Sequence, residues 1–201
     1  KGIRRRSGTD VYMCPWPVME KISELGSGSR IVAVFDFLEY AIPRDLTDGR
    51  GPLLYLCGMG DPGNVGTLIR SAASLGVSGV ALAPGTADPY SPKALRATMG
   101  AIFQVPVFIA LEPADLISRA KAAAIDIVCA DPHEGVELWH ADLANDFALV
   151  LGSEREGVPE ELLRAATTTV SIPQEALTES LNVAMAGTVV LYEALRQRVG
   201  V

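Results

Sequence analysis

Short apolar runs alternate with segments of helical periodicity from Pro52 to the end of the chain. Continuous apolar runs of this length are typical of strands that are buried on both faces. They cover residues 53–57, 80–83, 105–109, 125–130, 147–151 and 168–172. Helical patterns lie between and after them, over residues 65–75, 92–102, 114–123, 160–166 and 181–198. The alternation predicts an α/β fold in which helices flank a parallel sheet.

Residues at the ends of the predicted helices support this assignment. Ser91 and Pro92 supply an N-cap and a first-turn proline, and Gly76 stands where a C-terminal glycine belongs. The helix at 65–75 is amphipathic. Its apolar face carries Val65, Leu68, Ile69, Ala72 and Ala73, and its polar face carries Thr67, Arg70, Ser71 and Ser74.

The pattern before Pro52 is less regular. Residues 16–25 predict a short helix, and the apolar run at 30–35 predicts a strand. Residues 39–51 are rich in aspartate, glycine and proline, which is typical of a linker. We therefore divide the chain into an N-terminal part, residues 1–50, and a main domain, residues 51–201. The first residue is lysine, so we expect a segment of a longer polypeptide.

Composition narrows the class of protein. The chain has 201 residues and is 49% hydrophobic, enough for a full core. No apolar run approaches the roughly 20 residues of a membrane span, and no signal peptide is visible. Cys14, Cys57 and Cys129 form no CxxC pair, which favours reduced thiols in the cytoplasm. Cys129, His133 and His140 are too few ligands for structural zinc, so we predict no metal and ordinary loop roles for both histidines.

The formal net charge of −7 argues against a nucleic-acid partner, since phosphate attracts cations. The basic residues are unevenly distributed, however. Lys1, Arg4, Arg5 and Arg6 cluster at the start, whereas acidic residues concentrate after Glu112. An acidic total therefore leaves room for a basic face.

Three polar loops follow predicted strands, at the sheet edge where α/β proteins bind ligands. They are DPGNVG at 61–66, LGSEREGVP at 151–159, and the segment from Ile172 to Val183. Each loop also has a purely structural interpretation. Asn64 suits a helix N-cap, the two glycines suit a strand-to-helix turn, and Ser180 with Asn182 suits a helix start. The glycines equally suit a close approach of ligand to backbone.

Taken together and in order, these loops resemble the three motifs of the SpoU (TrmH-like) family of RNA ribose methyltransferases, in the SPOUT superfamily. NVGTLIRSAASLGVSGVAL at 64–82 is similar to the first motif, and LVLGSEREGVPEELL at 149–163 to the second. SIPQEALTESLNVAMAGTVVLYEAL at 171–195 is similar to the third. SPKALRATMGAIFQVPVF at 91–108 resembles the segment between them. The resemblance covers residues 52–198.

The resemblance implies a SPOUT α/β-knot, with a C-terminal trefoil knot that holds S-adenosylmethionine largely through backbone groups. The corresponding cofactor positions are Ala130, Gly152, Gly157, Ile172, Leu181 and Asn182. Residues 11–35 look like the end of the small RNA-binding domain that often precedes the SpoU domain. The implied partners are RNA and a second copy of the chain.

The implied reaction is methyl transfer from S-adenosylmethionine to a ribose 2′-hydroxyl, with ribosomal RNA favoured. Transfer to tRNA and an inactive RNA-binding module are the alternatives. Arg70 is expected to bind phosphate and stabilise the developing alkoxide, because a guanidinium is too weak an acid to serve as a base. Asn64 and Glu154 would orient Arg70 or the ribose, and Ser180 and Asn182 would complete the pocket.

Two positions depart from the family pattern. Ala184 replaces a common serine, and Gln174 with Glu175 stands where methionine and a glycine-type turn are frequent. The family also forms dimers whose sites draw on both subunits. A small-residue apolar stripe on helix 181–198 suits that interface, although it equally suits packing on its own sheet. It consists of Val183, Ala186, Gly187, Val190, Leu191 and Ala194.

Overall fold

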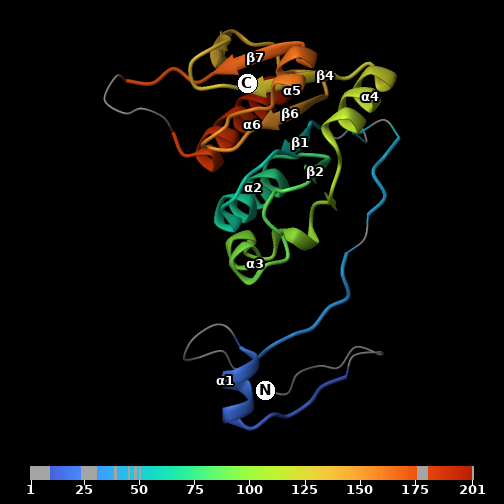
Figure 1. The fold of residues 1–201 in the computed structure, drawn as a ribbon, viewed down its shortest axis with the longest axis vertical. Coiled ribbons are helices and arrows are strands. Elements are labelled where there is room, and N and C mark those ends of the chain that lie inside the picture. Colours follow the sequence, from blue (N-terminus) through green and yellow to red (C-terminus); the bar gives the residue numbers. More distant parts are fainter. Residues whose placement is uncertain are drawn as a thin grey trace. The chain divides into compact units, whose positions relative to one another are not determined.

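The fold is taken from a computed structural model, which describes residues 10–23, 31–38, 40–44, 46–47, 49, 51–175 and 181–200. The chain forms two compact units that divide after Phe37, and each is described by itself (Figure 1). The basic cluster at residues 1–6 and Ser180 lie outside the described residues.

The larger unit contains a seven-stranded sheet in the order β3-β2-β1-β6-β4-β7-β5, in which every pairing is parallel. The predicted parallel α/β sheet is confirmed. Each strand predicted after Pro52 is present, with ends shifted by at most two residues. Only β5 was missed, because two exposed residues form no apolar run. The strands are β1 (Leu53–Leu56), β2 (Gly79–Leu82), β3 (Val107–Phe108), β4 (Asp126–Ala130), β5 (Val136–Glu137), β6 (Phe147–Leu151) and β7 (Thr168–Ser171).

The predicted helices are also present, with two corrections. Helix 92–102 ends early, because Met99 and Gly100 adopt positive φ values of 50° and 87° and a 3-10 turn follows. Asp61, not Asn64, caps the helix predicted at 65–75, which begins at Pro62; its side chain accepts from the backbone N–H of Gly63. The helices are α2 (Pro62–Ser74), α3 (Pro92–Thr98), α4 (Pro113–Ala123), α5 (Glu160–Ala165) and α6 (Val183–Val199), with 3-10 turns at Ala101–Phe103 and Leu138–His140.

Helices cover both faces of the sheet (Figure 1). Leu54 and Leu56 of β1 pack in one core with the apolar faces of α2 and α6. Leu53 and Tyr55, which point to the opposite face, pack in a second core with residues of α4 and α5. Alternate residues of one strand therefore serve two cores, as expected for a sheet that is covered on both sides.

The small-residue stripe of α6 packs inside its own subunit. Gly187, Val190, Leu191 and Ala194 are buried, and a Cβ on Gly187 would lie 2.4 Å from Leu151 Cδ1. The prediction that this stripe forms the dimer interface is wrong. A side chain at Gly187 would have to displace Leu151 of β6 and Leu68 of α2.

The predicted linker packs on the larger unit. Leu46 is buried in the second core, and Thr47 Oγ1 donates to Asp146 at 3.0 Å. Tyr40 meets Phe108 edge-to-face, and Tyr90 Oη donates to the carbonyl of Leu38 at 3.0 Å. The compact unit therefore begins at Leu38. The domain assignment of residues 1–50 stays a prediction.

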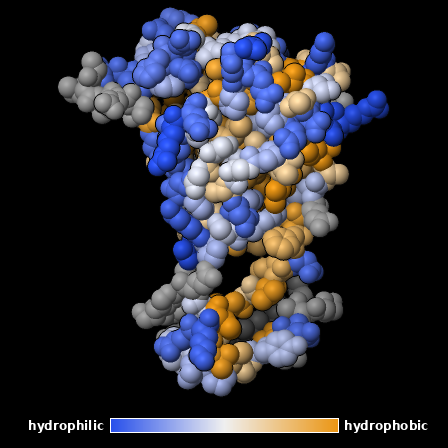
Figure 2. Space-filling model, viewed as in Figure 1, coloured by the Kyte–Doolittle hydropathy of each residue, from blue (hydrophilic) through white to orange (hydrophobic). Residues whose placement is uncertain are grey.

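The N-terminal unit contains helix α1 (Trp16–Ile22). The strand predicted at 30–35 is wrong for its described residues: residues 31–35 have no strand structure, and Val34 is 94% exposed. A strand needs a paired neighbouring strand, and residues 10–23 and 31–37 contain no strand assignment. Hydrophobic residues consequently form part of the surface of this unit (Figure 2).

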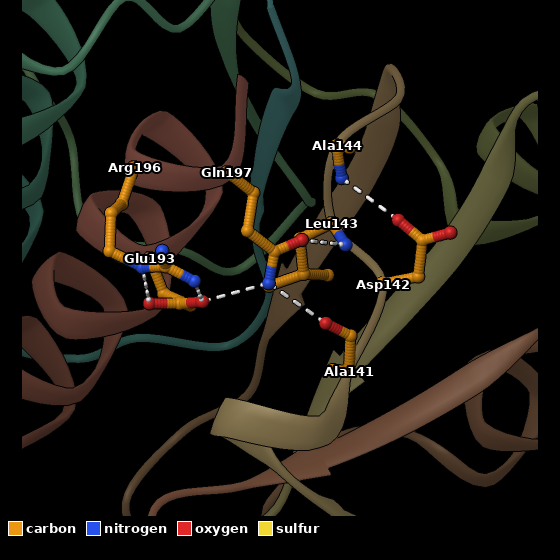
Figure 3. A network of polar contacts seen from close by, with 7 residues as sticks. All are labelled: Ala141, Asp142, Leu143, Ala144, Glu193, Arg196 and Gln197. Carbon is orange, nitrogen blue, oxygen red and sulfur yellow. Dashed lines mark hydrogen bonds and ion pairs between the residues drawn. The ribbon is translucent and has the colours of Figure 1, made fainter. Parts of the chain in front are cut away.

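The C-terminal end of α6 is tied to the loop before β6 (Figure 3). Gln197 Oε1 accepts from the backbone N–H of Leu143 at 2.7 Å, and its Nε2 donates to the carbonyl of Ala141 at 2.9 Å. Glu193 accepts from both Gln197 and Arg196, each at 2.8 Å. These bonds hold the last turns of α6 against the 141–144 loop.

No helix in the described part of the chain is long and apolar enough to cross a bilayer.

Candidate functional site

A cavity of about 380 Å³ opens at the carboxyl ends of three adjacent strands, β6, β4 and β7. This is the edge where open α/β sheets bind ligands. The strand ends supply Ala130, Leu151 and Val170, and the loops that follow them supply most of the remaining wall. The volume suits a small organic ligand.

The cavity wall has two chemical characters. Leu151 and Val170 are buried, and further apolar residues come from beyond β7 and from the start of α6: Ile172, Leu181, Val183 and Ala186. Charged residues line another part of the wall: Asp131, Glu154, Arg155 and Glu156. Such a wall fits a ligand that has both a flat apolar group and a charged group.

The predicted cofactor positions converge on this cavity. Ala130, Gly152, Gly157, Ile172 and Leu181 all line it. Asn182 does not line it, but follows Leu181 directly and takes part in the network described below. Their role as cofactor contacts stays a prediction.

The two glycines of the 152–157 loop are required by the turn itself. A Cβ on Gly152 would lie 2.1 Å from the carbonyl carbon and oxygen of Gly157. Gly157 has a φ of +69°, and its N–H donates to the carbonyl of Ser153 at 3.0 Å. The structure thus supports the turn interpretation of these glycines. The same tight turn presents Glu154, Arg155 and Glu156 to the cavity.

A chain of side-chain hydrogen bonds joins the three predicted motifs. Asn64 Nδ2 donates to Glu154 Oε1, and Asn182 Nδ2 donates to Asn64 Oδ1 at 3.1 Å. The partners are separated by 90 and 118 residues in sequence. We call Asn64, Glu154 and Asn182 the motif network. It adjoins the cavity, because Glu154 lines the wall.

Helix α6 fixes the orientation of the network. Asn182 is the N-cap, and its Oδ1 accepts from the backbone N–H groups of Ala184 at 2.9 Å and Met185 at 3.4 Å. Because that oxygen serves the cap, Nδ2 is left to donate to Asn64. Asn64 must then use its own amide nitrogen toward Glu154. A helix cap therefore sets the direction of hydrogen bonding through the motif network.

Arg70 is not part of the network. It lies six residues after Asn64 on α2, about 9 Å farther along the helix axis at 1.5 Å per residue. Its side chain is exposed and makes no hydrogen bond or ion pair with any residue that the structure describes. The guanidinium is therefore available for a partner outside the subunit. Ser180, the remaining predicted site residue, cannot be placed, as it is outside the described range.

Sequence reasoning missed several residues at the site. His133 was expected to have an ordinary loop role, yet it lines the cavity beside Asp131. Asp131 Oδ1 shapes this loop by accepting from the backbone N–H groups of His133 and Glu134 at 2.8 and 3.0 Å. Gln174 was not missed: the sequence marked it as a departure from the family pattern, and it lines the cavity too. The available signal was position, since each follows a predicted buried strand.

The start of α2 is held by an ion pair that the sequence did not predict. Asp61 accepts from Lys93 Nζ at 2.5 Å and from the backbone N–H of Gly63 at 2.9 Å. The hydrogen bond from Lys93, followed by that from Gly63, lowers the pKa of Asp61 below its usual value. This contact fixes the loop before Asn64 against α3.

The cysteines and histidines show no metal-binding arrangement among the described residues, where no group of three potential ligands occurs. Cys57 and Cys129 are buried, whereas Cys14 is exposed. Burial, followed by the charge of Asp131, raises the pKa of Cys129 to about 12. This thiol is consequently a poor nucleophile at neutral pH.

Comparison with known proteins agrees with the placement of the motifs. The SpoU rRNA Methylase family matches residues 52–192. The chain belongs to this family. The resemblance inferred from the three motifs is thereby confirmed.

Relatives within the SpoU family include named rRNA methyltransferases. The 23S rRNA (uridine(2479)-2′-O)-methyltransferase of Streptomyces viridochromogenes is 36% identical over 69% of this chain and 50% of its own length. The 23S rRNA (guanosine(2553)-2′-O)-methyltransferase RlmP of Bacillus subtilis is 29% identical over 92% of this chain and 73% of its own. The chain spans about half the length of the first of these relatives.

Solved structures in the SpoU family share the fold. The AdoMet-bound rRNA methyltransferase from Sinorhizobium meliloti is 36% identical, with a TM-score of 0.73 over 79% of this chain and 61% of that one. The SpoU methyltransferase AviRb from Streptomyces viridochromogenes, in complex with AdoMet, has 34% identity and a TM-score of 0.71 over 79% of this chain and 60% of that one.

Proposed function

We propose that the chain is the catalytic domain of an S-adenosylmethionine-dependent methyltransferase that modifies ribose 2′-hydroxyls of ribosomal RNA. The observation that carries this proposal is the motif network, which joins residues of all three SpoU motifs at the edge of one cavity. The rRNA 2′-O-methyltransferases of Streptomyces and Bacillus support the reaction and the RNA class.

The cavity fits the cofactor chemically. S-adenosylmethionine would supply a methyl group on a positively charged sulfur. The apolar wall around Ile172 and Leu181 suits the adenine, and the backbone of Gly152 lies at the same edge. Arg155 and Glu156 offer opposite charges for the carboxylate and ammonium of the methionine part. Ala130, Gly157 and Asn182 complete the proposed cofactor site.

Arg70 is the proposed contact to RNA. A guanidinium binds phosphate through paired N–H donors and stabilises negative charge that develops on the ribose oxygen. Because it keeps its proton, it does not act as the base. Asn64 and Glu154, held by Asn182, would orient the ribose. Ser180 is proposed to complete the substrate side.

A homodimer is proposed to bring Arg70 to the site. The solvent face of α6 carries Met185, Val189 and Tyr192, which are 57, 41 and 60% exposed and lie on one stripe at spacings of four and three. We propose that a second copy buries this exposed stripe. The dimer interface would then lie on the solvent face of α6 and not on the inward face predicted from the sequence. Arg70 would then serve the partner's cavity. Light scattering should give a dimer mass for the chain and a monomer mass for Tyr192→Lys.

The finer points of the fold are proposed on family grounds. We propose a C-terminal trefoil knot and an N-terminal remnant of a small RNA-binding domain. The Bacillus relative supports the second point, since its match covers 92% of this chain. Action on ribosomal RNA would place the protein in the cytoplasm. An experimental structure that traces residues 171–183 tests the knot.

Transfer to tRNA is the second candidate. One solved structure concerns 2-OH methylation of C/U34 on tRNA and is 29% identical to this chain. Its TM-score is 0.69, and this chain covers 99% of it. Methyl incorporation into separated rRNA and tRNA fractions distinguishes the two substrates. Incorporation into neither, with cofactor bound, would instead identify an inactive RNA-binding module.

The direct test of Arg70 combines activity with binding. Arg70→Ala should lower methyl incorporation by roughly 100-fold or more, the usual effect of removing one stabilising donor. Calorimetry should show unchanged affinity for S-adenosylhomocysteine, because the proposed contacts of Arg70 are to the RNA phosphate and ribose and not to the cofactor. Full activity of this variant would overturn the proposed role.

A further inference from the structure

Gln174 is a residue of the cavity wall that carries a buried hydrogen-bond acceptor without a partner. The residue lines the wall, two positions after Ile172. Its Oε1 is buried and has no hydrogen-bond partner among the described residues. Among the described residues, Ser23 carries the other such oxygen; it belongs to the N-terminal unit and is not a residue of the cavity wall.

A buried acceptor without a donor costs free energy, so it calls for a partner. The position is also a departure from the family pattern, in which methionine is frequent. Methionine would fill the same space without a strong acceptor. Glutamine therefore adds a hydrogen-bonding requirement to this wall that the common family residue does not have.

We propose that the side chain of Gln174 accepts a hydrogen bond from the 6-amino group of the cofactor's adenine. This inference rests on the proposed function. S-adenosylmethionine carries three kinds of donor: the adenine amino group, the ribose hydroxyls and the α-ammonium. Carboxylates on the wall, Asp131, Glu154 and Glu156, are the stronger acceptors for the ammonium and the hydroxyls.

The neighbours of Gln174 select the adenine among these donors. Ile172 and Leu181 line the apolar part of the same cavity. Transfer of a purine ring from water costs the least free energy there. An uncharged acceptor beside them matches an uncharged N–H₂ donor. The last torsion of a glutamine side chain is broad, so the amide can turn its oxygen from the buried position toward a ligand in the cavity. Gln174 is thus a specificity-determining residue for the purine.

The test measures binding by calorimetry with the full chain and two probes. One probe is S-adenosylhomocysteine, and the other is its analogue in which the purine lacks the 6-amino group. Gln174→Met should weaken binding of the first probe by roughly three- to tenfold, the range of one net hydrogen bond, and leave binding of the second unchanged. Gln174→Glu keeps an acceptor and should retain the preference for the amino purine. Gln104→Met, the same change at an exposed position outside the cavity, should alter neither affinity.

The outcomes separate this inference from the proposed function. If Gln174→Met weakens both probes equally, or neither, the hydrogen bond to the amino group does not exist. If Gln174→Glu loses the preference as completely as Gln174→Met, the acceptor is not the feature that matters. If the wild-type chain binds neither probe, the proposed function itself fails.

Discussion

Helix α6 carries a polar network at each end, and the two differ in what they bind. At its start, Asn182 contacts Asn64, which contacts Glu154, all through exposed side chains. At its end, Gln197 bonds to backbone groups of Leu143 and Ala141 in a partly buried contact (Figure 3). The first network links side chains at a cavity, whereas the second links a helix to a loop.

The network at the end of α6 stabilises the fold, whereas the motif network at its start positions side chains for function. Backbone groups that lose water on folding need a partner, and Gln197 satisfies two of them. The motif network satisfies backbone groups only at the α6 cap. Its remaining bonds hold exposed side chains that water could equally satisfy, so they contribute little to folding. These bonds fix the positions of the three side chains beside the cavity.

The largest expected effect is on activity, from Asn182→Asp. Aspartate keeps an oxygen for the α6 cap but removes the amide donor to Asn64. Methyl transfer should fall by about 100-fold, while the unfolding free energy should change by less than about 0.5 kcal/mol. Asn182→Ala loses the cap as well and should cost about 1 kcal/mol. Wild-type activity in Asn182→Asp would show that the motif network is structural.

Gln197→Ala should lower stability and leave activity unchanged. It leaves the N–H of Leu143 and the carbonyl of Ala141 without their partner. The unfolding free energy from urea titration should fall by about 1–3 kcal/mol, with methyl transfer at saturating cofactor unchanged below the unfolding transition. Gln104→Ala, at an exposed position, is the matched control. A loss of activity in folded Gln197→Ala would show that the network at the end of α6 also contributes to methyl transfer.

The smallest expected effect depends on pH and concerns Glu193. Hydrogen bonds from Arg196, and then from Gln197, lower the pKa of Glu193 from 4.5 to about 2. A lowered carboxyl pKa stabilises the folded state above the unfolded value and loses that effect as pH falls through the folded one. The Tm difference between wild type and Glu193→Gln should therefore be constant above about pH 5 and shrink between pH 4.5 and 2. A difference that does not vary with pH over that range would contradict the ion pair.

The sheet and helices were predictable because their signals are local. Phe147–Leu151 is an apolar run flanked by turns, and it is a central strand. Residues 31–35 show the same local pattern but no strand, because strand formation depends on a neighbour that the run itself does not specify. Apolar character alone therefore predicts burial only where the topology supplies a partner.

Three of the residues that the sequence assigned to one site lie together, but their contacts could not be predicted. Asn64, Glu154 and Asn182 each stood in a recognisable loop, yet their hydrogen bonds span 90 and 118 residues. The inward face of α6 could not be identified from its periodicity, since both faces carry apolar residues. Gln174 was visible only as a departure from a pattern; its unsatisfied oxygen required the packed structure.

The proposed reaction is methyl transfer to a ribose, with the cofactor in the cavity and the motif network beside it. The most direct measurement is mass spectrometry of nucleosides from ribosomal RNA that has been incubated with the chain and labelled S-adenosylmethionine. We expect label in a 2′-O-methylated nucleoside, and strongly reduced label with Asn182→Asp. Label in a methylated base, or no label from a chain that binds the cofactor, would contradict it.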